Sequence, residues 1–331
     1  MALKKMLLRL FCVKNKDSKK KACAPHSTVS ANKSHFEPCS SGTGAVQWVQ
    51  KHEPARSNFS DHHYANSSPG KATKDWVKAI QSEWNLLQKN LPASIYVRVY
   101  EQRMDLLRAA IVGPAGTPYH DGLFFFDVRF PSEYPKCPPK VHYHSGGLRL
   151  NPNLYESGKV CLSLLNTWWG NGCEKWAKSN STMLQVLVSI QGLVLNDKPY
   201  FNEPGNKNSA KTAVGEKNSL AYNQTAFILS CKTMLYSLRK PPKHFETLVA
   251  CHFYEREHVI LESCGAYLSG TIVGSSVRNG TKYACDKCFA DFTKSLAIYT
   301  EQLRKEFASN KTRVLELVRE ASSADEIVPA S

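Results

Sequence analysis

The first part of the chain with a regular pattern begins near Thr73, where apolar side chains recur at helical spacing. They are three or four positions apart and therefore share one face of an α-helix: Trp76, Ile80, Trp84, Leu87 and Leu91. Pro92 follows directly and ends the pattern, because proline cannot continue a helix. The spacing predicts an amphipathic helix with one buried side.

Three extended runs follow this helix, with short turns between them. The first covers residues 95–99, with Val or Ile at alternate positions, and the others cover 106–112 and 123–130. A proline-rich stretch at 131–139 and a short run at 141–144 come next. Proline cannot donate to a strand ladder, so we read the proline-rich stretch as a surface loop. Short runs joined by tight turns predict an antiparallel meander.

Helical patterns dominate the rest of the chain. Thr182 and Gln185 have the spacing of a capping box, and the run after them is apolar on nearly every side, which predicts a buried helix. Three further helical regions are predicted at 219–239, 244–268 and 286–319. A helix, a meander and then several helices indicate an α+β fold.

These patterns divide the chain into three parts. Residues 1–72 form a basic, largely disordered leader, in which 22–70 are rich in Ser, Asn, His and Pro and have little periodicity. Residues 73–240 form the core domain, and 241–331 form a helical C-terminal extension. The chain lacks a run of about 18 apolar residues, so the sequence predicts no membrane-spanning helix. A secretory signal is not indicated either, because the start lacks a small-residue cleavage site.

Charge changes the interpretation of the leader. The chain of 331 residues has 43 Lys and Arg against 28 Asp and Glu, a net charge of +15, and residues 1–70 account for +7 of it. One interpretation is a solvated leader; another is a short basic helix at 1–21 that touches an anionic membrane surface, with Cys12 as a lipidation site. A third, nucleic-acid binding, is not expected, because half of the excess charge lies in the leader.

The cysteines point to thiol chemistry rather than to disulfides. Eleven is an odd number in a chain with enough apolar residues for a core, so reduced thiols in the cytosol or nucleus are expected. Cys161 follows an irregular stretch rich in Asn, Pro and Gly, and such a turn can present a nucleophile; the alternative is an inert core thiol. Cys285 and Cys288 have metal-ligand spacing but no second pair, so no metal site is expected. His142 and His144 alternate on a short strand and are read as structural.

A longer series of motifs around Cys161 resembles one known family. The segment GPAGTPYHDGLFFFDVRFPSEYPKCPPKVHYH, followed by LNPNLYESGKVCLSLL, is similar to the core of a ubiquitin-conjugating enzyme (E2). The resemblance covers about residues 74–240. Downstream, NTWWGNGCEKWAKSNSTMLQVLVSIQGLVLNDKPYFNEPG and the tail around HFYEREHVILESCGAYLSG are similar to the large plant enzymes of this family, including the phosphate-homeostasis type. The first of these segments is also similar to the conjugating domains of hybrid conjugating-ligase proteins.

The resemblance implies a fold, an activity and three site residues. It implies the ubiquitin-conjugating fold, a four-stranded antiparallel meander with flanking helices. It implies that Cys161 accepts ubiquitin from the activating enzyme as a thioester and that a lysine of a target protein then attacks it. Asn153 matches the asparagine that stabilises the oxyanion or the active-site loop, and Glu203 matches an acidic position near the acceptor lysine, with Asp197 as a rival. No cofactor is implied for this chain, because the activating enzyme consumes the ATP.

The sequence departs from the family pattern in three places. Asn151 stands where the family has a histidine of mainly structural role. Lys136 stands at a loop position that is often apolar for docking RING-type ligases, so a ligase of that kind is expected to bind weakly or to be dispensable. The segment after Cys161 is about eight residues longer than in small family members. Trp168, Trp169 and Trp176 after Cys161 either anchor this longer loop or bind a partner, and the sequence leaves both readings open.

Overall fold

A computed structural model describes residues 52–55, 59–70, 72–275 and 287–325. Its centre is one five-stranded sheet in the order β1-β2-β3-β4-β5. The strands are β1 (His52–Ala55), β2 (Ile95–Tyr100), β3 (Leu106–Val112), β4 (Leu123–Arg129) and β5 (Lys140–Tyr143). Strands β2 to β5 pair antiparallel in sequence order, which confirms the predicted meander. Strand β1 adds a parallel edge to β2 that the sequence did not predict.

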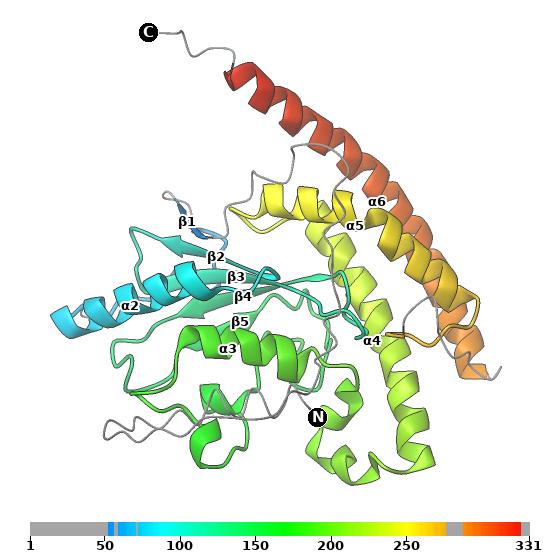
Figure 1. The fold of residues 1–331 in the computed structure, drawn as a ribbon, viewed down its shortest axis with the longest axis horizontal. Coiled ribbons are helices and arrows are strands. Elements are labelled where there is room, and N and C mark those ends of the chain that lie inside the picture. Colours follow the sequence, from blue (N-terminus) through cyan, green and yellow to red (C-terminus); the bar gives the residue numbers. More distant parts are fainter. Residues whose placement is uncertain (1–51, 56–58, 71, 276–286, 326–331) are drawn as a thin grey trace, which may run out of the picture.

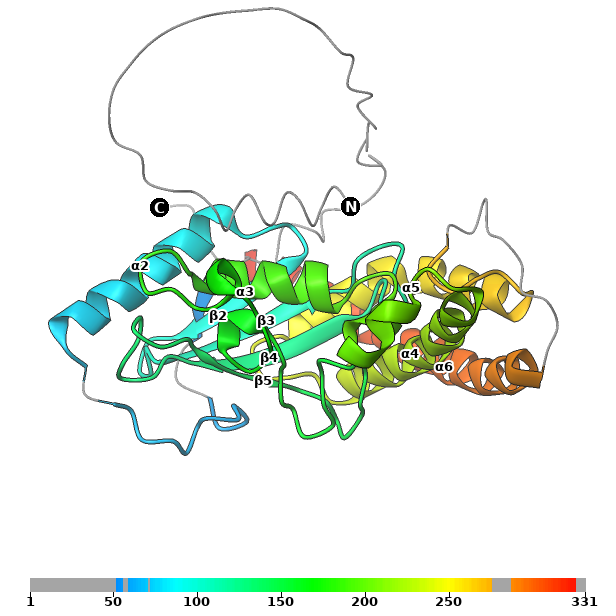
Figure 2. The same ribbon diagram turned by 90° about the horizontal axis from the view of Figure 1, so that it is seen from below.

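Two helices cover one face of the sheet (Figures 1 and 2). Helix α2 (Lys74–Asn90) begins where Thr73 accepts a hydrogen bond from the main-chain N–H of Trp76. Helix α3 (Met183–Ser189) begins with the predicted capping box of Thr182 and Gln185 and continues as a π-helical turn, η4 (Ile190–Val194). Apolar side chains from both helices meet alternate residues of β3 and β4 in a single cluster: Ile80, Leu87, Val186, Ala109, Phe124 and Phe126.

The C-terminal helices share a second apolar cluster with the sheet. They are α4 (Ala213–Arg239), α5 (Glu246–Leu268) and α6 (Lys287–Asp325), close to the predicted bounds. Residues of opposite orientation on the strands supply the sheet side of the cluster: Ala110, Leu123 and Phe125. Asn310 of α6 donates to the carbonyl of Ala250 in α5 at 2.8 Å, and Arg239 pairs with Glu306 at 2.6 Å. The described part of the extension therefore packs onto the core.

The chain is ordered earlier than the predicted start near Thr73. Residues 59–70 lie against the sheet on the face opposite α2 and α3 (Figure 2). Arg108 of β3 has no exposed surface and pairs with Asp127 of β4 at 2.6 Å and with Asp61 at 2.8 Å. Burying a guanidinium requires such partners. The interpretation of residues 22–70 as a linker is therefore wrong for 52–55 and 59–70, whereas residues 1–51 lie outside the described part.

Among the described residues, no helix is both long enough and apolar enough to cross a membrane. The proposed surface helix at 1–21 and its Cys12 lie outside the described residues.

Stability is expected to fall as the pH drops from 7.5 to 5. Burial lowers the pKa of His62, of His142 (to about 4) and of His252, so these rings are neutral when folded but gain a proton when unfolded. Their contribution is complete above the ordinary histidine pKa of about 6.5 and is lost as the pH falls towards the folded values. Each histidine can contribute up to about 1.4 kcal/mol per pH unit in that window.

Urea unfolding at several pH values measures this slope, and a His142→Asn variant should show a shallower one. Glu83 acts in the opposite direction, because burial raises its pKa, but it is one group against three. An unfolding free energy that stays constant between pH 7.5 and 5 would contradict the prediction.

Candidate active site

Cys161 is paired with Asn153 through two hydrogen bonds. The main-chain N–H of Cys161 donates to the carbonyl of Asn153 at 2.9 Å, and the Asn153 side-chain Nδ2 donates back to the carbonyl of Cys161 at 3.0 Å. The tight turn between them needs Gly158, which has φ +83° and packs so closely on His142 that a Cβ would lie 2.0 Å from the imidazole. The eight-residue spacing in the sequence is therefore a closed loop in space.

A second asparagine fixes this loop to the core. Asn151 is fully buried; its Nδ2 donates to the hydroxyl of Tyr119 at 2.8 Å and to the carbonyl of Val194 at 2.7 Å. Its Oδ1 accepts the main-chain N–H of Asn153 at 2.8 Å. Three hydrogen bonds of the Asn151 amide thus hold Asn153 in place opposite Cys161, so Asn151 has a structural role in this loop.

The Cys161 thiol lies in a protected environment with charges of both signs. The residue is only 1% exposed, and burial raises the pKa of the thiol. The positive charges of Lys159 and Arg149 lower that pKa, and the negative charge of Glu203 raises it. Both cations also lie over the ring of Tyr155, at 4.5 Å for Arg149 and 5.6 Å for Lys159. The thiol is therefore mostly protonated at neutral pH, with two cations near it that favour the thiolate.

Glu203 lies where its charge reaches the thiol, and Asp197 does not share this position. Glu203 is half-buried between two short 3-10 turns, η5 (Pro199–Asn202) and η6 (Pro204–Ser209). Its charge also contributes to raising the pKa of Tyr222 in α4 to about 12, after the larger effect of burial. Asp197 is exposed, and its carbonyl accepts from Asn223. Of the two candidate carboxylates, Glu203 is the one whose charge raises the pKa of the Cys161 thiol.

The three tryptophans that follow Cys161 have different surroundings in the structure. Trp176 is an anchor, because its indole Nε1 donates to the carbonyl of Pro135 in the proline-rich loop at 2.8 Å. Trp169 is 89% exposed. Trp168, directly before Trp169, is half-buried and makes no hydrogen bond through its side chain among the described residues. Lys136 lies exposed on the same proline-rich loop that Trp176 contacts.

The other candidates from the sequence do not join this site. Cys285 lies outside the described residues, and the described residues contain no group of three or more potential ligands that could hold a metal ion. His144 pairs through Nε2 with Asp127 at 2.9 Å, and His142 stacks on His63 with ring centroids 3.5 Å apart. These contacts are structural, as expected for both histidines.

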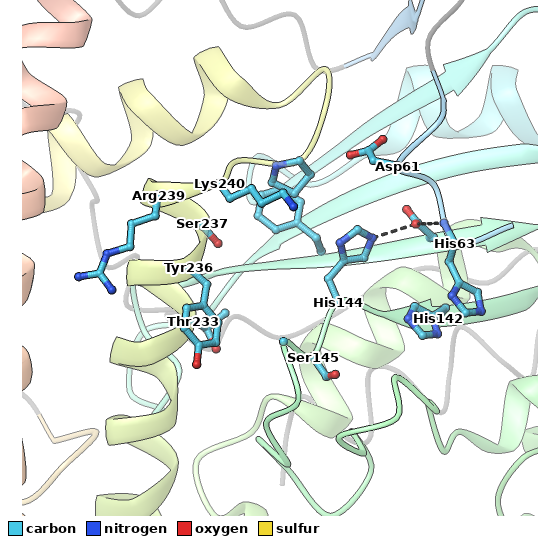
Figure 3. Close-up of a pocket in the computed structure, with 14 residues that line it drawn as sticks. Asp61, His63, His142, His144, Ser145, Thr233, Tyr236, Ser237, Arg239 and Lys240 are labelled. Carbon is cyan, nitrogen blue, oxygen red and sulfur yellow. Dashed lines mark hydrogen bonds and ion pairs between the residues drawn. The ribbon is translucent and has the colours of Figure 1, made fainter. Parts of the chain in front are cut away.

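A cavity of about 610 Å³ lies away from Cys161 (Figure 3). The 59–64 segment, β4, β5 and the end of α4 contribute its lining, and Cys161, Asn153 and Glu203 are not part of it. Figure 3 shows the imidazoles of His63, His142 and His144 on one side of it. The Asp127 carboxylate, which also lines the cavity, pairs with His144 and accepts the main-chain N–H of His63. The Asp127 carboxylate on this side is already paired with Arg108 and His144, so its charge is satisfied within the protein.

Sequence reasoning missed the cationic residues of the site. Arg149 and Lys159 lie twelve and two residues before Cys161, inside a motif that by itself assigns them no role. Lys159 could have been noticed from its closeness along the chain. Arg149 could not, because only the turn through Tyr155 brings its guanidinium to the same ring as Lys159.

The charges around Cys161 predict two opposite shifts in its reactivity. Lys159→Ala should raise the pKa of the thiol, and Glu203→Gln should lower it, because the first removes a stabilising positive charge and the second a destabilising negative one. Alkylation rates of Cys161 by iodoacetamide as a function of pH measure both. Exposed Lys178→Ala is a matched control that should leave the profile unchanged. Identical profiles for all variants would show that neither charge acts on the thiol.

A family model described as "Ubiquitin-conjugating enzyme" matches residues 79–228. The "Putative ubiquitin-conjugating enzyme E2 38" of Arabidopsis thaliana is 58% identical over 229 residues, which are 68% of this chain and 70% of that protein. The "Probable ubiquitin-conjugating enzyme E2 26" of the same plant is 58% identical over 227 residues, which are 68% of this chain and 42% of that protein.

A further relative is a much larger protein. The human "Dual E2 ubiquitin-conjugating enzyme/E3 ubiquitin-protein ligase BIRC6" is 38% identical over 242 residues, which are 70% of this chain and 5% of that protein. The chain thus matches less than half the length of several relatives.

Proposed function

The chain belongs to the ubiquitin-conjugating enzyme family, within the subgroup of large plant enzymes, and from that premise we propose that it carries ubiquitin as a thioester on Cys161 and transfers it to a lysine. The observation that supports this most directly is the closed loop in which Asn153 and Cys161 bond to each other at 2.9 and 3.0 Å. That loop places a single thiol beside an amide donor.

The first proposed step is an exchange of thioesters. The Cys161 thiolate attacks the carbonyl carbon at the C-terminus of ubiquitin, which is bound to a thiol of the activating enzyme. A new sulfur–carbon bond forms, the old one breaks, and the activating enzyme leaves as a thiol. The exchange is nearly balanced, because the attacking and leaving groups are both thiols. Lys159 and Arg149 favour the thiolate that this step needs.

The second proposed step forms an amide bond. A neutral lysine amine attacks the thioester carbonyl, negative charge develops on the carbonyl oxygen, and Cys161 leaves as a thiolate that regains a proton. The amide of Asn153 would donate to that oxygen or keep the loop in the shape that receives it. Glu203 would accept a hydrogen bond from the incoming amine and orient it. The low exposure of Cys161 limits competing attack by water.

The partners follow from these steps and remain part of the proposal. They are ubiquitin, the activating enzyme and a protein substrate, with ATP consumed by the activating enzyme and no cofactor bound to this chain. A ligase would approach the proline-rich loop, where exposed Lys136 disfavours an apolar RING surface. The proposed compartments are the cytoplasm and nucleus, with membrane-surface contact through residues 1–21.

Incubation with activating enzyme, ATP and ubiquitin tests the proposal. We expect an adduct that a thiol reductant cleaves, followed by transfer to free lysine. A non-catalytic interaction module of the same fold is the alternative, and it would give no adduct. An adduct that resists reductant from the outset would also contradict a thioester.

A further inference from the structure

The loop that follows Cys161 is held at both ends by hydrogen bonds. At its start, the hydroxyl of Thr167 donates to the carbonyl of Val160 at 2.7 Å and accepts the main-chain N–H of Leu162 at 3.0 Å. At its end, Trp176 is bonded to Pro135. In the middle, a short 3-10 turn (Gly172–Glu174) has a complete capping box between Asn171 and Glu174. The loop therefore has a defined shape.

The same bonds bring the middle of the loop back to the neighbourhood of Cys161. The hydroxyl of Ser163, two residues after Cys161, donates to the main-chain carbonyl of Trp169 at 3.1 Å. Gly170 packs so tightly on Ser163 that a Cβ would lie 2.6 Å from its side chain. Two residues span at most about 7 Å, and the Ser163 side chain with its hydrogen bond adds roughly 6 Å, so the main-chain carbonyl of Trp169 lies within roughly 13 Å of the backbone of Cys161.

The defined loop presents one large apolar group to solvent. Trp169 is 89% exposed, the highest value among the exposed large apolar side chains of the described residues. The others lie on α4, α5 and α6: Val214, Tyr236, Tyr254, Ile298 and Leu315. An exposed tryptophan on a loop held by several hydrogen bonds is the kind of residue that dominates the energy of an interface.

We infer that Trp169 contacts the ubiquitin carried by Cys161 and orients its thioester for attack by lysine. The inference rests on the proposed function and adds a contact residue to it. The thioester bond ties ubiquitin to Cys161, which explains why a single aromatic side chain is enough to hold the bound ubiquitin in one orientation. A group bonded to Cys161 has a high effective concentration at a site within roughly 13 Å, so a weak contact is occupied much of the time.

A freely diffusing partner is a poorer match for this surface. A stable interface between separate proteins usually needs more than about 1,000 Å² of buried surface around its anchor. Neighbouring side chains on the loop, including Asn171 and Lys175, are exposed and polar, and no other exposed large apolar residue of the described chain lies on it. Contact of Trp169 with the activating enzyme or with a ligase is therefore an alternative that the experiment below has to distinguish.

Single-turnover discharge tests the inference with the full chain. The variants are Trp169→Ala, Trp169→Phe and, as control, Tyr254→Ala, which removes a partly exposed aromatic ring from α5. We expect Trp169→Ala to be charged at the normal rate and to discharge to free lysine about tenfold more slowly, as for loss of one aromatic anchor. Trp169→Phe should recover part of the rate, and the control should match the wild type.

Acrylamide quenching gives a second readout that does not depend on activity. The fluorescence difference between wild type and Trp169→Phe reports Trp169, and its quenching should fall once ubiquitin is bound to Cys161. This measurement uses the conservative Phe variant at an exposed position, so it decides the question even where Trp169→Ala is destabilised.

The outcomes separate this inference from the proposed function. Failure of the wild type to form an adduct would overturn the proposed function. Normal charging with equal discharge by all variants and unchanged quenching would overturn only the role of Trp169. Slower charging with unchanged discharge would assign Trp169 to the activating enzyme, which also overturns the inference.

Discussion

Cys161→Ala should abolish the reductant-sensitive adduct with ubiquitin. The reason is chemical: the thioester needs a sulfur at the position that the Asn153 loop encloses, and alanine has none. Among the cysteines whose side chains the structure describes, four others are free thiols: Cys137, Cys231, Cys251 and Cys264. Cys231 and Cys264 are buried in the second apolar cluster, between α4 and α5, and burial helps raise the pKa of Cys137 and Cys251. None of them is bonded into a loop like that of Cys161.

Two further variants sharpen this prediction. Cys137→Ala removes a half-buried thiol from the proline-rich loop and should charge at the normal rate. Cys161→Ser should give a slowly formed oxygen ester that survives reductant, because a hydroxyl replaces the thiol in the same loop. Gel mobility with and without reductant distinguishes the products. A reductant-sensitive adduct on Cys161→Ala would remove the assignment.

Asn153→Ala should leave charging near normal and slow the discharge to lysine about 10²–10³-fold. Loss of one donor to a developing oxyanion has an effect of this size. Charging is an exchange between two similar thioesters and depends less on that donor. Single-turnover discharge of the preformed conjugate measures the second step alone. Exposed Asn180→Ala, in the longer loop, is the matched control and should discharge normally.

The structure allows the two possible roles of Asn153 to be told apart. Its Nδ2 already donates to the carbonyl of Cys161, and its buried Oδ1 has no hydrogen-bond partner among the described residues. If the loop bond is the main role, Asn153→Ala should lower the melting temperature and change the alkylation rate of Cys161. If oxyanion donation is the main role, both should stay constant while discharge slows. An unchanged discharge rate would show that Asn153 contributes to lysine transfer by neither route.

Secondary structure was largely predictable because its signals are local. Helix α2 was evident from five apolar residues on one face, and the capping box at Thr182 marked the start of α3. The meander followed from alternating residues and short turns, and its strand order was confirmed. Each of these patterns lies within one element, where period and capping chemistry act directly.

The ordered segment before α2 could not be predicted in this way. Residues 59–70 are polar and lack periodicity, yet Asp61 and His63 are bound to the sheet through Arg108 and Asp127. These contacts join residues that are far apart in the sequence. Composition indicates that such a segment cannot build a core of its own, and only the fold shows that it completes a buried ion pair.

The sequence by itself determined the family and the residue most suited to carry the chemistry. A motif of fixed order, with Asn153 eight residues before Cys161, depends only on which residues follow one another. The tertiary structure decided everything that depends on distance and exposure. It placed Glu203, rather than Asp197, where its negative charge raises the pKa of the thiol. It also made Trp176 an anchor and left Trp169 in solvent. Electrostatic effects and burial are set by neighbours in space, and those neighbours come from segments that the sequence keeps apart.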